Sequence, residues 1–334
     1  MRVKQCNACY PGEIIYQINF MQEQKIIPEI VEHFHRNHLY INIKDYILFV
    51  KETGITDIYN FCKDHIDIKD ISFRISNDSE WRPFETFREI LQLEWVDRII
   101  LQNLITCHYQ PIIDSSGKVF AYELLARFID ENDSDSLLPP YKVFSAAKER
   151  GRLYSLDRLC RMTAVRHAAS IKEKAFINFI PTSIYSPDHC LQSTVTLAHE
   201  LGINPNQFVF EVVETEEVED IEHLKSILKF YSEKGFLYAL DDVGEGFSTL
   251  EMLKEINPHY MKLDMKYVQG VSTDRNKQIM AEKFLSAGKK LGAVPLAEGI
   301  ETKEDYEWLK EKGFQLFQGY LFGKPSPIPQ EPQI

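Results

Sequence analysis

Two acidic side chains directly follow a short apolar run in the segment FLYALDDVGEGFS, which covers residues 236–248. Asp241 and Asp242 stand side by side at the end of this run, and a loop with two glycines comes next. Adjacent carboxylates repel each other, and a divalent cation between them cancels that repulsion. The segment therefore predicts a metal site at the carboxyl end of a strand.

Other apolar runs end in the same way. FVFEVVE, YMKLD, PLAEGIE and FINFIP each carry an acid, an amide or a lysine at or near their ends. The residues at such positions are Glu123, Asn178, Glu211, Lys262, Glu298, Glu301 and Gln318. Any one of them alone is more often a strand-terminal polar group that contacts solvent or caps a helix. Their recurrence favours one shared site, because the carboxyl ends of the strands meet on one face of a barrel of alternating strands and helices.

The donor types of these residues select the metal. Glu123, Asn178, Glu211, Asp241 and Asp242 all offer hard oxygen atoms. Oxygen ligands favour Mg2+ or Mn2+, with Ca2+ as a non-productive competitor, whereas zinc prefers histidine or cysteine. Lys262 adds a positive charge that can orient a nucleophile or neutralise a developing oxyanion, although a lone lysine is more often an ordinary ion-pair partner.

The pattern from about residue 101 onward predicts the fold that brings these groups together. Short apolar runs alternate with amphipathic stretches, and Gly202, Gly235, Gly292 and Gly313 mark helix ends. Helix starts are marked by the capping spacings Ser248 with Glu251 and Thr302 with Asp305. At least six such units predict a TIM-like (β/α)8 barrel of class α/β. An open doubly wound sheet is the alternative, but its glycine-rich phosphate fingerprint is not in the sequence.

The first 80 residues follow a different order. EIIYQINF, LYINI, YILFV and ISFRIS read as strands, and PEIVEHFHRN and ITDIYNFCKDHI read as helices. This strand-helix-strand-strand-helix-strand order fits a small α+β, ferredoxin-like domain at residues 1–80 that senses a signal or assembles with a partner. Regularly spaced apolar residues predict one long connecting helix within residues 81–106, ahead of a barrel at 107–330.

Composition excludes several classes of partner. The chain has 334 residues and a formal charge of −12, which argues against a nucleic-acid groove or an anionic membrane surface. Scattered cysteines and the absence of a signal-peptide profile or a run of about 20 apolar residues favour the cytoplasm. Cys6 and Cys9 have the spacing of half a zinc site or a redox pair, and free thiols are the simpler interpretation.

Seven segments in order resemble the motif series of the EAL-domain cyclic di-GMP phosphodiesterases. These are YELLARF, INFIP, EVVET, DDVGEGFSTL, KLD, AEGIET and QGYLFGKP, between about Tyr109 and Pro327. The resemblance implies a barrel that hydrolyses cyclic di-GMP to linear 5′-pGpG with two Mg2+ or Mn2+ ions, and a homodimer formed through the barrel. Whether pGpG is cleaved further is left open.

The resemblance also implies a role for each matched residue. It implies metal ligands at Glu123, Asn178, Glu211, Asp241, Asp242 and Glu298. It implies catalytic groups at Lys262, Glu298 and Asp241, with Lys262 beside the attacking water. It implies nucleotide contacts at Gln110, Arg127, Asp264, Glu301 and Gln318. Among these, Arg127 is implied to bind a phosphate of the substrate. Glu214 matches the residue that anchors the loop after the acid pair.

Three positions depart from the family pattern. Leu124 replaces a small residue, and it should point away from Glu123 because neighbouring strand residues face opposite sides. Val213 replaces a threonine, and Glu245 adds a carboxylate to the loop that Glu214 anchors. An alternative is therefore a barrel that no longer catalyses and acts as a cyclic di-GMP receptor or a protein-binding module. Such degenerate members typically lack several metal ligands, whereas none is missing here.

Overall fold

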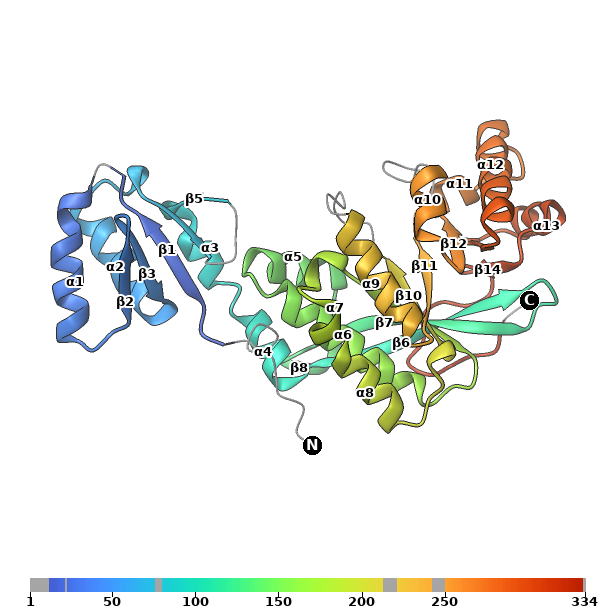
Figure 1. Cartoon of the computed structure of the whole chain (residues 1–334), viewed down its shortest axis with the longest axis horizontal. Helices are drawn as coiled ribbons and strands as arrows, with labels where there is room; N and C mark the ends of the chain where they lie inside the picture. The colour runs from blue at the N-terminus through green and yellow to red at the C-terminus, as the bar shows by residue number, and fades with distance from the viewer. Residues whose placement is uncertain (1–11, 22, 76–79, 213–220, 242–249, 333–334) are drawn as a thin grey trace. The chain divides into compact units, whose positions relative to one another are not determined.

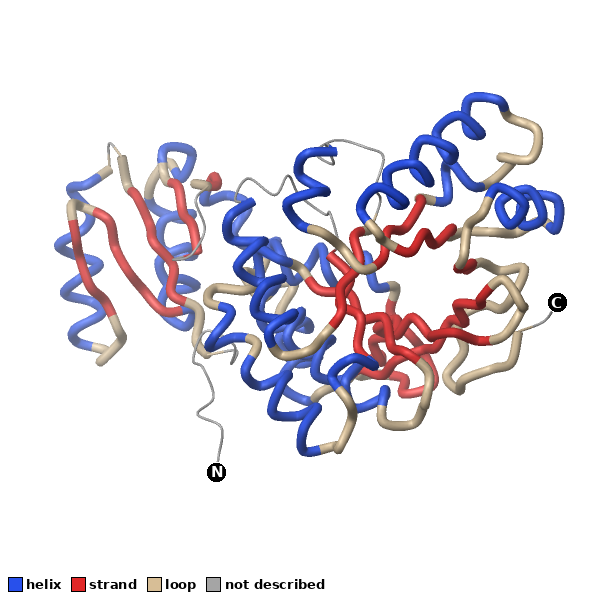
Figure 2. The backbone as a smooth tube through the Cα atoms, turned by 45° about the vertical axis from the view of Figure 1, so that its right-hand side comes forward, coloured by secondary structure: helices blue, strands red, loops and turns tan. Residues whose placement is uncertain are grey.

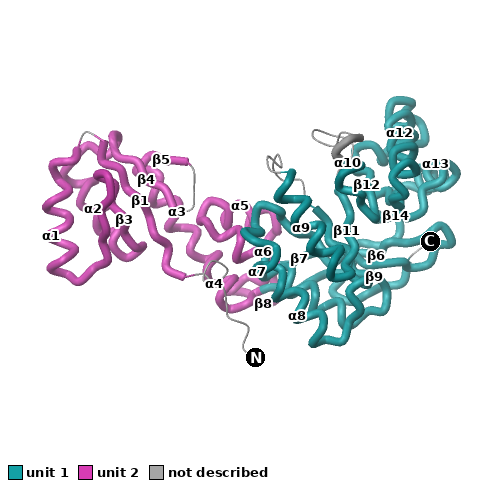
Figure 3. The backbone as a smooth tube through the Cα atoms, viewed as in Figure 1, with its two compact units in different colours: residues 1, 105–127, 157–334 teal, residues 2–104, 128–156 magenta. Residues whose placement is uncertain are grey.

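A computed structural model describes residues 12–21, 23–75, 80–212, 221–241 and 250–332, with the side chains of 250–252 excepted. The chain divides into two compact units, coloured separately in Figure 3. Unit 1 comprises residues 1, 105–127 and 157–334, and unit 2 comprises residues 2–104 and 128–156. In the described residues, no helix is long and apolar enough to cross a membrane.

Unit 2 begins with the predicted ferredoxin-like arrangement. Its strands are β1 (Ile15–Asn19), β2 (Ile41–Lys44), β3 (Ile47–Lys51), β4 (Ser72–Ile75) and β5 (Arg82–Pro83), with helices α1 (Ile27–Arg36) and α2 (Glu52–His65). The sheet order is β2-β3-β1-β4-β5, and every neighbouring pair is antiparallel. Each helix thus joins two strands that have a third strand between them (Figure 1). The split arrangement confirms the prediction made from the element order.

The prediction of one long connecting helix within residues 81–106 is wrong. The structure has a 3-10 turn at Phe84–Thr86, then α3 (Phe87–Leu91) and, after a turn, α4 (Trp95–Gln102). Ile90 of α3 and Val96 of α4 are both buried, yet residues six apart point about 120° away from each other on one continuous helix. Breaking the helix lets Phe84, Phe87 and Ile90 join the core of the ferredoxin-like sheet. The boundaries 1–80, 81–106 and 107–330 stay a prediction.

A second part of the chain completes unit 2. Strand β8 (Asp133–Leu138) pairs antiparallel with the last residues of β7 (Val119–Asp130), and α5 (Pro140–Glu149) follows. Arg150 directly follows α5 in the chain, and its buried side chain forms ion pairs with Glu52 of α2 and Asp97 of α4. Residues 128–156 are therefore tied to the ferredoxin-like part by buried charges.

Unit 1 is the predicted barrel, and its eight strands close on themselves. They are β6 (Ile105–Asp114), β7, β9 (Lys174–Phe179), β10 (Phe208–Val212), β11 (Leu237–Leu240), β12 (Tyr260–Leu263), β13 (Val294–Ala297) and β14 (Leu316–Gln318). The order is β6-β14-β13-β12-β11-β10-β9-β7, and pairing of β6 with β7 closes the ring. All pairs from β7 to β14 are parallel, whereas β6 runs antiparallel to β14.

Helices lie outside the strands, as Figure 2 shows. They are α6 (Leu153–Ala168), α7 (Pro187–Cys190), α8 (Gln192–Glu200), α9 (Ile221–Glu233), α10 (Leu250–Ile256), α11 (Met265–Val268), α12 (Arg275–Leu291) and α13 (Lys303–Lys312). Gly292 and Gly313 cap α12 and α13 in the left-handed conformation, as predicted. Thr302 caps α13 by accepting a hydrogen bond from the Asp305 amide, also as predicted. The capping pair Ser248 and Glu251 lies outside the described residues and side chains.

Candidate active site

One apolar side chain from each barrel strand fills the barrel interior. The eight residues form a single buried cluster: Ile112, Ala121, Phe176, Val209, Ala239, Tyr260, Leu296 and Leu316. Side chains alternate between the two faces of a strand, so a residue two positions further along a strand also points into the barrel. This cluster therefore fixes which residues line the next layer.

The next layer is polar in every strand. Two positions beyond the apolar cluster, on the parallel strands, the chain has Glu123, Asn178, Glu211, Asp241, Lys262, Glu298 and Gln318. Two positions before the cluster on the antiparallel β6 it has Gln110. The strand-end residues predicted from the sequence, apart from Glu301 and Asp242, are thus brought to one end of the barrel. Gln110 is two residues from Ile112 on the same strand, so both side chains face the barrel interior. This spacing could have placed Gln110 in the polar layer without the family resemblance.

Glu123 is held by two amides. Its Oε1 accepts a hydrogen bond of 2.7 Å from Asn178 Nδ2, and its Oε2 accepts one of 2.6 Å from Gln318 Nε2. Burial opposes ionisation of Glu123, but nearby Lys262 and the two amide donors outweigh it and lower its pKa. Leu124 packs on the opposite side of the strand in the outer apolar core, as predicted. The bulkier residue therefore leaves Glu123 facing inward.

Lys262 lies among three carboxylates. Its Nζ is 3.0 Å from Glu211 Oε1, 2.9 Å from Glu298 Oε2 and 3.3 Å from Asp241 Oδ1. Burial favours the neutral amine, yet these carboxylates outweigh it and hold the pKa of Lys262 well above its usual value. The lysine is therefore a fixed positive charge at the centre of the polar layer.

The carboxylates outnumber this single described cation. Glu211 is 0% exposed, and burial raises its pKa well above the usual range. Burial likewise raises the pKa of Glu298, to about 7. Glu211 Oε1 is paired with the Lys262 ammonium at 3.0 Å, whereas no described residue donates a hydrogen bond to Glu211 Oε2 or to Gln318 Oε1. Open acceptors in an acidic, buried layer are the chemistry that a divalent cation satisfies.

The residues of the polar layer fit a divalent metal by the type of their donor atoms, but they do not yet surround a metal position. Among the described residues, no group of three or more histidine, cysteine, aspartate or glutamate side chains already surrounds a common point. Lys262 stands between the carboxylates of Glu211, Asp241 and Glu298, and the amide of Asn178 is a further oxygen donor. The neighbouring acid Asp242 lies outside the described residues, as do Val213, Glu214 and Glu245.

The predicted nucleotide contacts lie at different depths. Gln110 is buried, and its Nε2 donates to the Gly323 carbonyl at 3.5 Å. Among the described residues Arg127 makes no ion pair, and burial lowers its pKa. Asp264 caps α11 by accepting a hydrogen bond of 2.7 Å from the Lys266 amide. Glu301 is exposed and accepts a hydrogen bond of 3.2 Å from Gln269.

Gly319 lets the end of β14 approach the segment that follows β13. A Cβ atom at this position would lie 2.0 Å from the Ile300 carbonyl oxygen, so no larger residue fits without a backbone shift. The Ile300 amide donates to the Gln318 carbonyl at 3.0 Å across the same contact. The glycine thus fixes the backbone from which Gln318 reaches Glu123.

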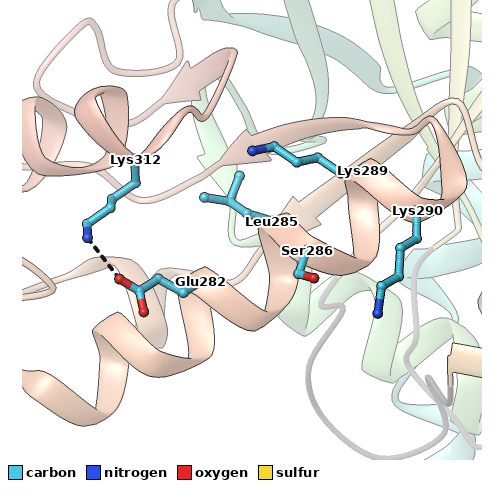
Figure 4. A pocket seen from close by; sticks show the side chains of 6 residues that line it. All are labelled: Glu282, Leu285, Ser286, Lys289, Lys290 and Lys312. Atoms are coloured by element: carbon cyan, nitrogen blue, oxygen red, sulfur yellow. Dashed lines mark hydrogen bonds and ion pairs between the residues drawn. The ribbon is translucent and has the colours of Figure 1, made fainter.

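A hollow on the outer helices of unit 1 is separate from the polar layer. Its volume is about 430 Å³. Figure 4 shows the side chains that line it: Glu282, Leu285, Ser286, Lys289, Lys290 and Lys312. These residues belong to α12 and α13, and Lys312 is paired with Glu282 at 2.8 Å. None of them comes from a barrel strand, so the hollow is not the candidate site.

Comparison with known proteins identifies the family. The family model described as "EAL domain" matches residues 93–325. The cyclic di-GMP phosphodiesterase PdeR of Escherichia coli K12 is 27% identical over 73% of this chain and 38% of its own length. The probable cyclic di-GMP phosphodiesterase PdeG of the same organism is 30% identical over 70% of this chain and 46% of its own length. The chain thus spans less than half the length of these curated relatives.

Solved structures share the fold. A standalone EAL protein from Vibrio cholerae O395 in its c-di-GMP bound form is 33% identical, with a TM-score of 0.59 over 66% of this chain and 92% of that one. The FimX EAL domain of Xanthomonas citri in complex with c-di-GMP is 16% identical, with a TM-score of 0.66 over 74% of this chain and 99% of that one, a likeness of fold alone. With a family match over most of its length and a barrel of the same fold, the chain belongs to the EAL-domain family, which includes cyclic di-GMP phosphodiesterases.

Proposed function

We propose that the barrel hydrolyses cyclic di-GMP to linear 5′-pGpG with two Mg2+ or Mn2+ ions. The observation that carries the proposal is the buried polar layer, in which Glu123, Glu211, Asp241 and Glu298 surround one described cation, Lys262. A layer with so many carboxylates would repel a phosphodiester. It becomes a phosphodiester site once divalent cations reverse its charge.

The residues that would hold the ions are the oxygen donors of this layer. They are Glu123, Asn178, Glu211, Asp241 and Glu298, together with Asp242 beyond the described residues. When bound, two such ions would neutralise the phosphodiester and supply a water acidic enough to attack it at neutral pH. The donors are carboxylate and amide oxygens, which fits Mg2+ or Mn2+ rather than zinc.

The side chains around the ions would orient the reacting groups. Lys262 is kept protonated by its three carboxylate contacts and would direct the attacking water through its ammonium hydrogens. Arg127 is half-buried without an ion-pair partner among the described residues, so its guanidinium is available to donate two hydrogen bonds to the oxygens of a phosphate. Gln110, Asp264, Glu301 and Gln318 would line the nucleotide cleft.

The test is a product assay on purified protein with cyclic di-GMP and Mn2+. We expect pGpG to accumulate, and we expect Asp241→Asn to lower turnover at saturating Mn2+ by about 1,000-fold, since ligation of this kind supplies several kcal/mol of transition-state stabilisation. Wild-type turnover by Asp241→Asn would overturn the ligand assignment. Saturable nucleotide binding without product would favour the receptor alternative.

We also propose that the ferredoxin-like part of unit 2 regulates the barrel and that the protein acts as a cytoplasmic homodimer. Support for regulation comes from unit 2 itself, where Arg150 pairs with Glu52 of the ferredoxin-like part. Arg150 belongs to residues 128–156, which begin with the last residues of β7, the strand that carries Glu123. Deleting residues 1–80 should change turnover. Unchanged turnover and an unchanged oligomeric state would contradict both a regulatory and an assembly role.

A further inference from the structure

A buried charge pair in α6 contacts the segment that follows strand β9. Asp157 is 3% exposed and Arg161 is 1% exposed. Arg161 Nη1 donates to Asp157 Oδ2 at 2.6 Å, and its Nε donates to Thr194 Oγ1 of α8 at 3.2 Å. None of these side chains belongs to the polar layer of the barrel. Spaced four apart on one helix, the pair resembles an ordinary surface ion pair in the sequence, which gives no sign of its burial.

The Asp157 carboxylate holds both ends of one turn. Its Oδ1 accepts a hydrogen bond of 2.9 Å from the Ile180 amide, which lies just beyond β9. Its Oδ2 accepts one of 2.6 Å from the Ser183 hydroxyl, at the end of the 3-10 turn Pro181–Ser183. One buried side chain therefore fixes where the backbone leaves the strand and where the turn closes.

The strand that this turn ends carries Asn178. Asn178 is two residues before Ile180, its backbone pairs with Glu211 on β10, and its side-chain amide donates to Glu123 at 2.7 Å. Only Phe179 separates Asn178 from the residue that Asp157 holds. A displacement of the Ile180 amide would therefore shift Asn178 relative to Glu123 and Glu211, two candidate metal ligands.

Stability alone gives little reason for this pair. Burying two charges costs desolvation energy that their attraction repays only with good geometry, and apolar replacements are often no less stable. What the pair does supply is directional hydrogen bonding to one backbone amide and one hydroxyl. Groups of this kind behind a metal ligand orient the ligand, and their loss typically lowers metal affinity or activity about 10- to 100-fold.

We propose that Asp157, held by Arg161, is a positioning residue that sets the orientation of Asn178 in the metal site. This proposal rests on the proposed function for the identity of the site. Asp157 does not belong to the polar layer, so its effect would reach the chemistry only through the Ile180–Ser183 turn.

The experiment measures Mn2+ affinity by the paramagnetic resonance signal of free Mn2+, in the full chain without nucleotide. We expect Asp157→Asn to weaken Mn2+ binding about 10-fold or more, because an amide cannot retain the charge-assisted bonds to Arg161 and Ser183. Ser183→Ala removes one of the bonds and leaves the buried ion pair, so it should weaken binding less. It also keeps the proposal testable if Asp157→Asn does not fold.

The matched control is Val165→Ala. Val165 is 0% exposed on the same helix α6, and its side chain has no hydrogen-bonding group, so its truncation loosens the outer core but leaves the Asp157 hydrogen bonds to Ile180 and Ser183 in place. We expect a lower melting temperature and Mn2+ affinity within about twofold of wild type. Equal weakening by Val165→Ala and Asp157→Asn would show a merely structural role and would overturn the proposal.

A second readout does not depend on the metal. Asn178 and Gln318 both donate a side-chain amide to Glu123, so their NH2 resonances can be compared in one 15N spectrum of metal-free protein. Asp157→Asn should shift the Asn178 resonance more than that of Gln318. Unchanged Asn178 resonances, or wild-type Mn2+ affinity, would contradict the positioning role. A wild type that binds Mn2+ but forms no pGpG would refute the proposed hydrolysis while these two measurements still decide the role of Asp157.

Discussion

Each unit of this protein contains a cluster of acids around a buried basic side chain, and the two clusters differ in charge balance. In unit 2, Arg150 is 2% exposed and contacts Glu52 and Asp97, each at 2.7 Å, while Arg152 also pairs with Asp97. Two acids thus meet two bases. In unit 1, Lys262 is 1% exposed and meets Glu211, Asp241 and Glu298, with Glu123 close enough to affect its pKa.

The difference separates a structural cluster from a candidate catalytic one. Arg150 also donates to the Ile90 carbonyl, so its hydrogen-bonding capacity is used within unit 2. Around Lys262 the acids are in excess, and Glu211 Oε2 has no hydrogen-bond donor among the described residues. Burial raises the pKa of Glu211, and the carboxylates of Glu123 and Asp241 raise it further. The ammonium of Lys262 lowers this pKa but does not compensate for them. An excess of buried carboxylates over cations favours the binding of further cations, whereas a charge-balanced cluster does not.

The largest effect is expected from Lys262→Met. Removing the ammonium leaves several buried carboxylates uncompensated, so metal-free protein should lose about 3–5 kcal/mol of unfolding free energy. Mn2+ should recover part of that loss, because a divalent cation can take over the charge compensation. Urea unfolding with and without Mn2+ measures both effects. A variant whose stability does not respond to Mn2+ would contradict the metal site.

Arg150→Met is the matched change in the balanced cluster. It should also cost stability, about 3 kcal/mol, because Glu52 loses its buried ion-pair partner. Here added Mn2+ should restore no more stability than it adds to the wild type. Urea unfolding under the same two conditions measures this. Preferential recovery of Arg150→Met by Mn2+ would remove the distinction between the clusters.

Asp305→Asn tests a third case, a buried carboxylate satisfied by hydrogen bonds instead of a cation. Asp305 accepts bonds of 2.9 Å from the amides of Gly270 and Ser272, and Thr302 donates its hydroxyl at 2.7 Å. Burial raises the pKa of Asp305, but these donors outweigh it and lower the pKa overall. We expect the variant to lose about 1–3 kcal/mol at pH 7.

The pH dependence of that loss follows from its sign. A carboxyl group with a lowered folded-state pKa stabilises the fold above its unfolded value, about 3.9, and loses that contribution as the pH falls through the folded-state value. The stability difference between wild type and Asp305→Asn should therefore shrink below about pH 4. A difference that stays constant down to pH 2 would show that the charge of Asp305 contributes nothing.

Local patterns were enough to predict much of both units. Strand-end residues such as Asn178 and Glu211 predict the polar layer, because side-chain alternation and parallel pairing bring them to one end of the barrel. The ferredoxin-like sheet could be predicted because the element order of residues 1–80 is compatible with few topologies.

The errors and omissions arise where tertiary contacts decide. Apolar spacing from Phe84 to Ile105 does not show that Phe87 packs into the ferredoxin-like core and that the helix breaks before Trp95. Nor does the sequence show that Asp157 and Arg161 are buried, since the same four-residue spacing serves exposed pairs such as Lys303 with Glu307. Burial of a charge depends on which helices cover it, and that depends on the whole fold.

The central claim is that oxygen donors from separate strands hold two divalent cations in the polar layer. The most direct measurement is the anomalous diffraction of Mn2+ in crystals of the full chain with cyclic di-GMP. We predict two Mn2+ peaks about 3.5–4 Å apart, bounded by Glu123, Asn178, Glu211 and Asp241. Crystals with Mn2+ present but no peak at these residues would contradict the account.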